Sequence, residues 1–152
     1  MNPLTAARLA LIARLETISA GSGYITSAGA NVRTGWLNEL LKEQGVGFPL
    51  IVVQQAKPSQ AAISDGHSVL VPLSFSVVGA VQVGIDYEAA IEDLTLDLIR
   101  CLTPSPGVSV AWRSTDMRDL RIKPPEFYPP GDGVSAATVL FPVELSVVIA
   151  GA

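Results

Sequence analysis

The chain is poor in the residues on which most catalytic and metal sites depend. Its 152 residues include one cysteine and one histidine. A single cysteine cannot form an internal disulfide, and one cysteine with one histidine cannot complete a Cys/His zinc site. Charged residues make up only 16% of the chain and aromatic residues 6%. We therefore expect a protein that is not an enzyme and that has no catalytic residue, no cofactor and no metal ion.

Long apolar runs and an excess of basic charge are also lacking. No apolar run approaches the roughly 20 residues that a membrane-spanning helix needs, and Met1-Asn2-Pro3 does not begin a secretory signal. The formal net charge is −4 and the isoelectric point about 4.8. A general nucleic-acid binder would normally be basic. We expect neither a membrane nor a stably bound nucleic acid as a partner.

Apolar residues are what the chain has in excess. Hydrophobic residues make up 49% of it and the mean hydropathy is +0.41, which excludes a disordered chain. The length fits one domain, 1–152. A monomer of this size buries only about 70% of its unfolded surface, so part of the surplus predicts a homo-oligomer, with a tightly packed monomer as the alternative.

Hydrophobic periodicity predicts three helices. Apolar residues recur at helical spacing over 4–20 and 85–102, and a shorter amphipathic helix is expected at 36–44. Between the first and the short helix, 21–35 reads as a turn followed by a short irregular strand or hairpin. Thr103-Pro104 ends the last helix.

Strands are predicted where β-branched residues cluster or apolar residues alternate. No linker separates two domains, and the order of elements favours an α+β fold: a mainly antiparallel sheet with two principal helices packed on one face, in a ring-forming protein. The predicted strands are 48–55, 68–83, 108–112 and 137–150, with loops at 56–67 and 113–133.

Two of these strands resemble each other. Residues 69–80 and 139–150 are identical at seven of twelve aligned positions, although half-buried strands draw on few residue types and convergence explains the match as well. Each carries a proline well inside it, Pro72 and Pro142. Proline cannot donate to the ladder, so each site needs an edge, a bulge or a change of partner. One hypothesis is that these prolines mark where the strands leave the main sheet to meet a neighbouring subunit.

The last predicted helix carries a cluster of acidic residues. Asp86 is in position to cap it, and Glu88 lies in its first turn. Acidic pairs at i,i+4 could share a metal or a proton, but without histidine or an Asn-rich loop they favour a solvated face or an acidic docking surface. Like charges at this spacing cost a few tenths of a kcal/mol, which favours a basic partner. The five acids are Asp86, Glu88, Glu92, Asp93 and Asp97.

Basic residues gather in the segment that follows. A nucleic-acid patch would be denser, and Asp116 and Asp119 are interleaved, so self-association is the preferred interpretation. An acidic helix and a mildly basic loop are the pattern expected of head-to-tail contact between copies. With the five acids and the two prolines, the predicted interface residues are the bases Arg113, Arg118, Arg121 and Lys123.

Two weaker candidates concern chemistry. A nucleophilic pair of Cys101 and His67 would need the two side chains to meet in the fold, and nothing local supports it. Gly21-Ser22-Gly23 follows a helix rather than a strand and lacks the lysine of a phosphate-binding loop. A small enzyme or ligand-binding domain stays open as an alternative on these grounds alone.

The linear pattern resembles a known family. The resemblance spans roughly 4–102 together with the final long strand, and 113–133 takes no part in it. It is to the tail terminator proteins of long-tailed bacteriophages. The segments that carry it are Gly23-Tyr24-Ile25-Thr26, Gly29-Ala30-Asn31-Val32-Arg33-Thr34-Gly35, Phe48-Pro49-Leu50-Ile51-Val52-Val53, Val77-Val78-Gly79, and Asp93 and Asp97 ahead of Ile99.

The resemblance implies structural work in the virion. Tail terminators are small α/β proteins that form a hexameric ring, cap the tail tube, end its polymerisation and provide the surface for head–tail joining. The implied partners are other copies of the chain, the major tail tube protein and a head-completion or connector protein, with assembly in the host cytoplasm and a final place at the tail–neck junction. DNA would only pass through the lumen, where an acidic protein does not trap it. Another phage neck protein of similar fold is the alternative.

The two predicted loops have a place in this expectation. We expect 56–67 and 113–133 to project along the ring axis and to touch the tube or the head connector.

Overall fold

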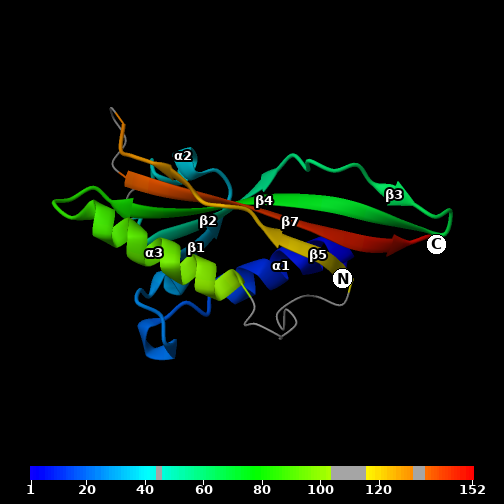
Figure 1. Ribbon diagram of the computed structural model, residues 1–152, viewed down its shortest axis with the longest axis horizontal. Helices are drawn as coiled ribbons and strands as arrows, with labels where there is room; N and C mark the ends of the chain where they lie inside the picture. Colours follow the sequence, from blue (N-terminus) through cyan, green and yellow to red (C-terminus); the bar gives the residue numbers. More distant parts are fainter. Residues whose placement is uncertain (44–45, 104–115, 132–135) are drawn as a thin grey trace.

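A mixed sheet with helices on both faces forms the described part of the chain. The computed structural model describes residues 1–43, 46–103, 116–131 and 136–152. Seven strands form one sheet in the order β1-β2-β4-β7-β5, with β3 paired to β4 and β6 paired to β7 (Figure 1). The strands are β1 (Val32–Thr34), β2 (Leu50–Ala56), β3 (Ile63–Ser64), β4 (Ser68–Gln82), β5 (Met117–Ile122), β6 (Glu126–Tyr128) and β7 (Ala136–Ala150).

Three helices complete the fold of these residues. They are α1 (Pro3–Leu15), α2 (Leu37–Leu40) and α3 (Tyr87–Leu102), with 3-10 turns η1 (Ala20–Ser22) and η2 (Ala28–Asn31). Only the β1–β2 pair is parallel; the other strand pairs are antiparallel. The predicted α+β class with a mainly antiparallel sheet is therefore confirmed.

The long strands β4 and β7 form the centre of the sheet. They pair without interruption from Ser68–Ala150 to Gln82–Ala136. Successive side chains of a strand point to opposite faces, so the alternating apolar residues of both strands gather on one face. Phe75, Val77 and Phe141 are buried there. The alternation seen in the sequence thus specifies which face becomes the main core.

Helices α1 and α3 cover that face and lie nearly end to end across it (Figure 1). Each buries an apolar stripe in the same core, Ala7, Leu11 and Leu15 from α1 and chiefly Leu94 and Leu98 from α3. The prediction of two principal helices on one face is confirmed.

Gly79 lets α3 approach β4 closely. A Cβ at this position would lie 2.8 Å from Leu94 Cδ2, a distance that well-packed cores do not tolerate without movement. The absent side chain therefore sets how near the helix lies to the strand.

A smaller core lies on the opposite face. Because β2 alternates, Ile51 and Val53 face the main core, whereas Leu50 and Val52 face α2. The helix predicted at 36–44 is present as α2, but it is shorter and spans Leu37–Leu40.

The predicted helix at 4–20 ends early, at Leu15. Thr17 Oγ1 donates to the Arg14 carbonyl at 2.6 Å, and a side chain that bonds to the local backbone competes with continuation of the helix. The chain then turns, and η2 docks through a bond from the Gly29 amide to the Ile18 carbonyl at 2.9 Å.

The prediction of a loop over 113–133 is wrong. The segment contains β5 and β6, which both pair with β7. β5 has the sequence MRDLRI, and its exposed residues are charged. Its few apolar residues do not form the run of alternating apolar positions by which a strand is predicted. The strand predicted at 108–112 lies outside the described residues.

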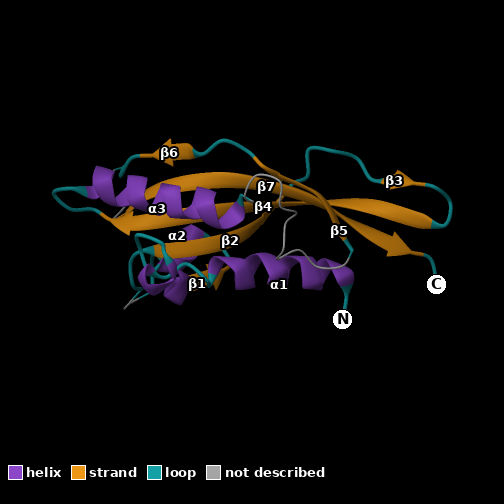
Figure 2. Ribbon diagram, turned by 60° about the horizontal axis from the view of Figure 1, so that its bottom comes forward, coloured by secondary structure: helices purple, strands orange, loops and turns teal. Residues whose placement is uncertain are grey.

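The predicted loop 56–67 contains the short strand β3 and ends in the expected turn. Asp65 Oδ1 accepts from the His67 and Ser68 amides at 2.8 and 2.7 Å, and Gly66 has a φ of 90°. β3 lies at the far end of the molecule from β6 (Figure 2).

The prediction that Pro72 and Pro142 mark strands leaving the sheet is wrong. Both prolines lie inside the β4–β7 ladder, Pro72 opposite Ser146 and Pro142 opposite Ser76. What changes is the neighbour on the other side. Pro72 lies between the stretches of β4 that pair with β3 and with β2, and Pro142 lies between those of β7 that pair with β5 and with β6.

The missing amide hydrogen of each proline faces one of these interruptions. The Pro142 carbonyl accepts from the Lys123 amide at 2.9 Å, so its polar backbone edge points away from β4. Ser76 of β4 lies opposite Pro142, so its polar backbone edge likewise points away from the β4–β7 pair. Positions two residues apart in a strand point the same way, and Pro72 lies four residues before Ser76. The backbone edge of Pro72 therefore points toward the gap between β2 and β3. Of the three alternatives expected at these prolines, an edge, a bulge or a change of partner, the structure shows the change of partner, and the physical reason is the absent donor.

Candidate interaction surfaces

The exposed side of α3 is acidic, as predicted, with one exception. Asp86, Glu88, Glu92 and Asp93 are exposed, and Glu88 lies in the first turn. Asp86 is the N-cap residue, as its position predicts, but its side chain makes no capping hydrogen bond. Neither Glu88 nor Glu92 has an ion-pair partner among the described residues.

Asp97 is not on this solvated face. It is fully buried and accepts hydrogen bonds from the Ile25 amide at 3.0 Å, the Thr26 amide at 2.7 Å and Thr26 Oγ1 at 2.8 Å. Helical periodicity is the signal that could have shown this, because position 97 lies on the apolar stripe between Leu94 and Cys101. The role of Asp97 is to anchor the segment before η2.

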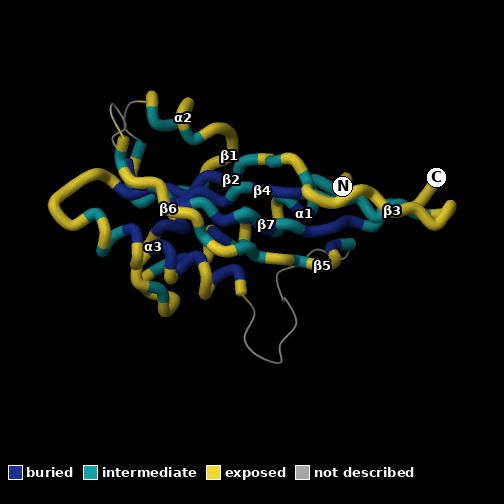
Figure 3. Tube along the Cα trace, turned by 45° about the horizontal axis from the view of Figure 1, so that its top comes forward, coloured by how far each residue is buried: buried dark blue, intermediate teal, exposed yellow. Residues whose placement is uncertain are grey.

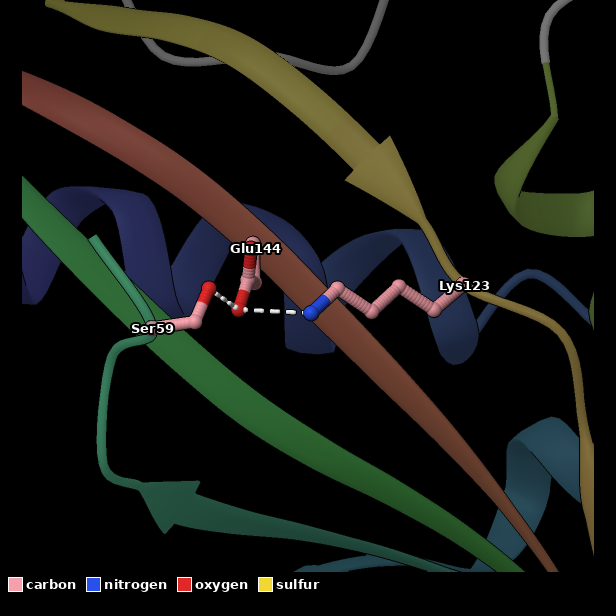
Figure 4. A network of polar contacts seen from close by, with 3 residues as sticks. All are labelled: Ser59, Lys123 and Glu144. Carbon is pink, nitrogen blue, oxygen red and sulfur yellow. Dashed lines mark hydrogen bonds and ion pairs between the residues drawn. The ribbon is translucent and has the colours of Figure 1, made fainter.

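The predicted basic residues are distributed over a strand. Arg118 and Arg121 lie in β5 and Lys123 directly follows it; Arg113 lies outside the described residues. Lys123 Nζ lies 3.0 Å from Glu144 Oε1 in an ion pair. Ser59 Oγ donates to the same oxygen at 2.6 Å (Figure 4).

This network clamps three segments together. Glu144 lies in the middle of β7, Ser59 comes from the β2–β3 connection and Lys123 from the β5–β6 connection (Figure 4). The hydrogen bond from Ser59, followed by that from Lys123, lowers the pKa of Glu144 below its ordinary value. The segment 57–62 is therefore tied to the sheet at Ser59.

The β6 edge carries a concentration of exposed aromatic side chains. Phe127 is 54% and Tyr128 48% exposed, and Figure 3 shows β6 on the surface of the molecule. We call these two residues the aromatic ridge. The Tyr128 hydroxyl donates to Glu126 Oε2 at 3.0 Å.

A groove lies on each side of the aromatic ridge. The groove toward α3, about 300 Å³ in volume, is the α3 groove, and that toward α2, about 380 Å³, is the α2 groove. The α3 groove is lined by Tyr87, Glu88, Ile91, Glu92, Phe127, Tyr128, Pro129, Ala137 and Thr138. The α2 groove is lined by Trp36, Leu37, Asn38, Gln54, Val78, Tyr128, Thr138 and Leu140.

Aromatic residues are enriched around these grooves far beyond their share of the chain. The sequence has two Trp, three Tyr and four Phe. Four of these nine, Trp36, Tyr87, Phe127 and Tyr128, line one groove or both. Exposed aromatic side chains dominate the energetics of protein interfaces, so the β6 edge is the strongest candidate interface in the described structure. The sequence pattern does not predict this interface, because β6 lies in the segment predicted to be a loop.

A third hollow, which we call the basic notch, lies where β2 ends beside α1. It has a volume of about 330 Å³. Arg8 lines it and has no ion-pair partner among the described residues. Ser74 lines it too; it is 7% exposed, and its hydroxyl has no hydrogen-bond partner in the described ranges. The lining residues are Leu4, Thr5, Arg8, Gln55, Ala56, Pro58, Leu73, Ser74 and Phe75.

Cys101 and His67 do not come together. Cys101 is buried, its Sγ donates to the Arg14 carbonyl at 3.2 Å, and burial raises the pKa of its thiol. His67 is exposed in the turn before β4, and neither residue lines a groove described above. Within the described residues, no group of three or more His, Cys, Asp or Glu side chains is placed to hold a metal ion.

Comparison with known proteins places the chain in no family. A scan of its sequence finds no matching family model, and a search of curated proteins finds no match. Among the described residues, no helix combines the length and the apolar character that crossing a membrane requires.

Proposed function

We propose that the chain is a structural virion protein that ends tail-tube growth in a long-tailed bacteriophage. In this proposal it caps the tube as a hexameric ring of identical copies and offers its outer face to the head-completion protein. It acts at the tail–neck junction after assembly in the host cytoplasm. The observation that carries the proposal is the exposed aromatic surface at the β6 edge of a charge-poor chain, because such a surface is typical of a protein built to be covered.

The fold and the sequence pattern add support. A small α+β domain with an antiparallel sheet is what the resemblance to tail terminators implies, and a ring needs two different, complementary surfaces on each copy. The acidic exposed side of α3 and the basic notch meet this need. The net charge of −4 also suits a ring through which DNA must slide, since phosphate binding depends on clustered cations.

The test is the length of the tail tubes made without this protein. We expect a phage lacking its gene to give overlong or unsealed tubes, and the gene supplied in trans to restore their length. Electron microscopy of purified tails measures both. Tubes of normal length that fail to join heads would contradict tube termination and would favour another neck protein of similar fold.

A further inference from the structure

We propose that the ring contact is made by the aromatic ridge of one copy seated in the basic notch of the next. The inference rests on the proposed ring and names the two surfaces that build it. The ridge residue Phe127 enters the notch, and Glu92 beside it pairs with Arg8 of the neighbouring copy.

The two surfaces have complementary charge. Glu88 and Glu92 line the α3 groove, which lies beside the ridge. Neither has an ion-pair partner among the described residues. Arg8 lines the notch, and exposed Lys57 lies between two residues that line it, Ala56 and Pro58. Both cations also lack ion-pair partners in the described part of the chain. Unpaired charges of opposite sign on separate surfaces favour association through those surfaces.

The two surfaces also complement each other in shape and polarity. The ridge projects, with Phe127 and Tyr128 about half exposed. The notch is hollow, with about 330 Å³ of space, and Leu4 and Leu73 are among the residues that line it. A half-exposed aromatic ring that packs against these two side chains loses its contact with water, and aromatic rings buried in this way are the usual anchors of an interface.

The positions of the surfaces suit a ring rather than a two-fold dimer. β6 pairs with β7 on one side of the sheet, whereas the notch lies where β2 ends on the other side. β6 and the beginning of α1, which contributes Leu4, Thr5 and Arg8 to the notch, also lie toward opposite ends of the molecule (Figure 2). Contact between unlike surfaces on opposite sides is head-to-tail, and it closes into a ring when the rotation per copy allows.

Charge exchange between the two surfaces tests the contact. Light scattering over a concentration series measures the assembly of wild type, of Glu92→Lys, of Arg8→Glu and of an equimolar mixture of the two variants. Each variant alone places like charges in every contact, and we expect its apparent dissociation constant to rise by about tenfold or more. In the mixture every contact between unlike copies regains opposite charges, so alternating rings should form. Glu16→Lys, an exposed change away from both surfaces, should assemble as wild type.

The outcomes separate this contact from the ring itself. If both variants assemble into rings as readily as wild type, or if the mixture assembles no better than either variant, the ridge-and-notch contact is overturned and the ring is left in place. A wild-type protein that stays monomeric at every concentration, and also when bound to purified tubes, would overturn both. Circular dichroism of each variant verifies that the fold is retained, and Phe127→Ala, which changes no charge, should weaken assembly independently.

Discussion

At the scale of single residues, buried polar groups decide more than the exposed charges do. Asp97 is the fully buried carboxylate of α3, and it satisfies two backbone amides and one hydroxyl of the segment before η2. A buried charge is tolerated only when its hydrogen bonds are satisfied. The other acids of α3 are exposed and do not anchor another segment in this way, although the sequence alone predicts one acidic face for all five.

Asp97→Asn should therefore destabilise the protein strongly. The amide cannot accept hydrogen bonds with both of its polar atoms, so we expect the free energy of unfolding to fall by about 2–3 kcal/mol, with faster hydrogen exchange at the Ile25 and Thr26 amides. Urea denaturation and exchange followed by NMR measure the two effects. The matched control is Asp93→Asn, one turn earlier and exposed, which should change stability by less than about 0.5 kcal/mol; equal losses in both variants would contradict the anchor.

The clamp at Glu144 predicts a pH-dependent contribution to stability. The pKa of Glu144 is lower in the folded protein than its ordinary value, so the unfolded chain takes up the proton first as the pH falls. The stabilisation is complete above the ordinary carboxyl pKa and is lost as the pH falls through the lower folded value.

Glu144→Gln tests this dependence. At pH 7 we expect the variant to be less stable than wild type by about 1 kcal/mol, and we expect the difference to shrink as the pH is lowered toward 3. Urea denaturation at several pH values measures it. Glu16→Gln, which changes an exposed carboxyl outside the clamp, serves as the control. A difference that stays constant with pH would show that the Glu144 carboxylate is not the stabilising species.

At the scale of elements, the two similar strands are each other's partners. Ser74 lies opposite Glu144, and these are corresponding positions in the two similar sequences, so the β4–β7 ladder has a local pseudo-two-fold axis between them. The edge strand β5 is irregular, unlike the continuous β4–β7 ladder. Its register shifts between Arg118 and Arg121, and Asp119 has a φ of 51°. Charged, bulged edges resist pairing with other strands. Assembly by side-chain contact is therefore more plausible than assembly by joining sheets.

The joint between α1 and η2 predicts a strict requirement for glycine. A Cβ at Gly29 would lie 2.5 Å from the Glu16 carbonyl oxygen and 2.6 Å from that of Ile18. Because these are backbone atoms, Gly29→Ala should lower the melting temperature and cost about 2–3 kcal/mol. Gly84→Ala, where a Cβ meets nothing within 4 Å, is the control and should be nearly neutral. Similar melting temperatures for both variants would show that the joint can relax.

At the scale of the whole molecule, the exposed aromatic side chains of the described residues gather at the β6 edge. The grooves beside the aromatic ridge expose aromatic residues, and Trp36 at the α2 groove is 65% exposed. The 27 buried hydrophobic residues of the described ranges form two cores beneath the helices, and these exposed aromatic side chains belong to neither core.

Trp36→Ser should separate stability from assembly. The side chain is mostly exposed, so we expect the free energy of unfolding to change by less than about 0.5 kcal/mol. If the β6 edge is covered in the assembled state, loss of this ring weakens the oligomer measured by light scattering. A large loss of stability with unchanged assembly would assign Trp36 to the fold rather than to an interface.

The sequence by itself determined the class of the fold, the two long strands and the two principal helices, because hydrophobic period is a local property that each segment carries alone. It also determined that each proline needed an edge, a bulge or a change of strand partner. Only the tertiary structure decided which neighbour each proline lacks, that Asp97 is buried, and that 117–122 and 126–128 form strands, because these depend on segments distant in the chain. The candidate interface belongs to this second group: its aromatic residues come from three separate segments, and only folding brings them to one edge.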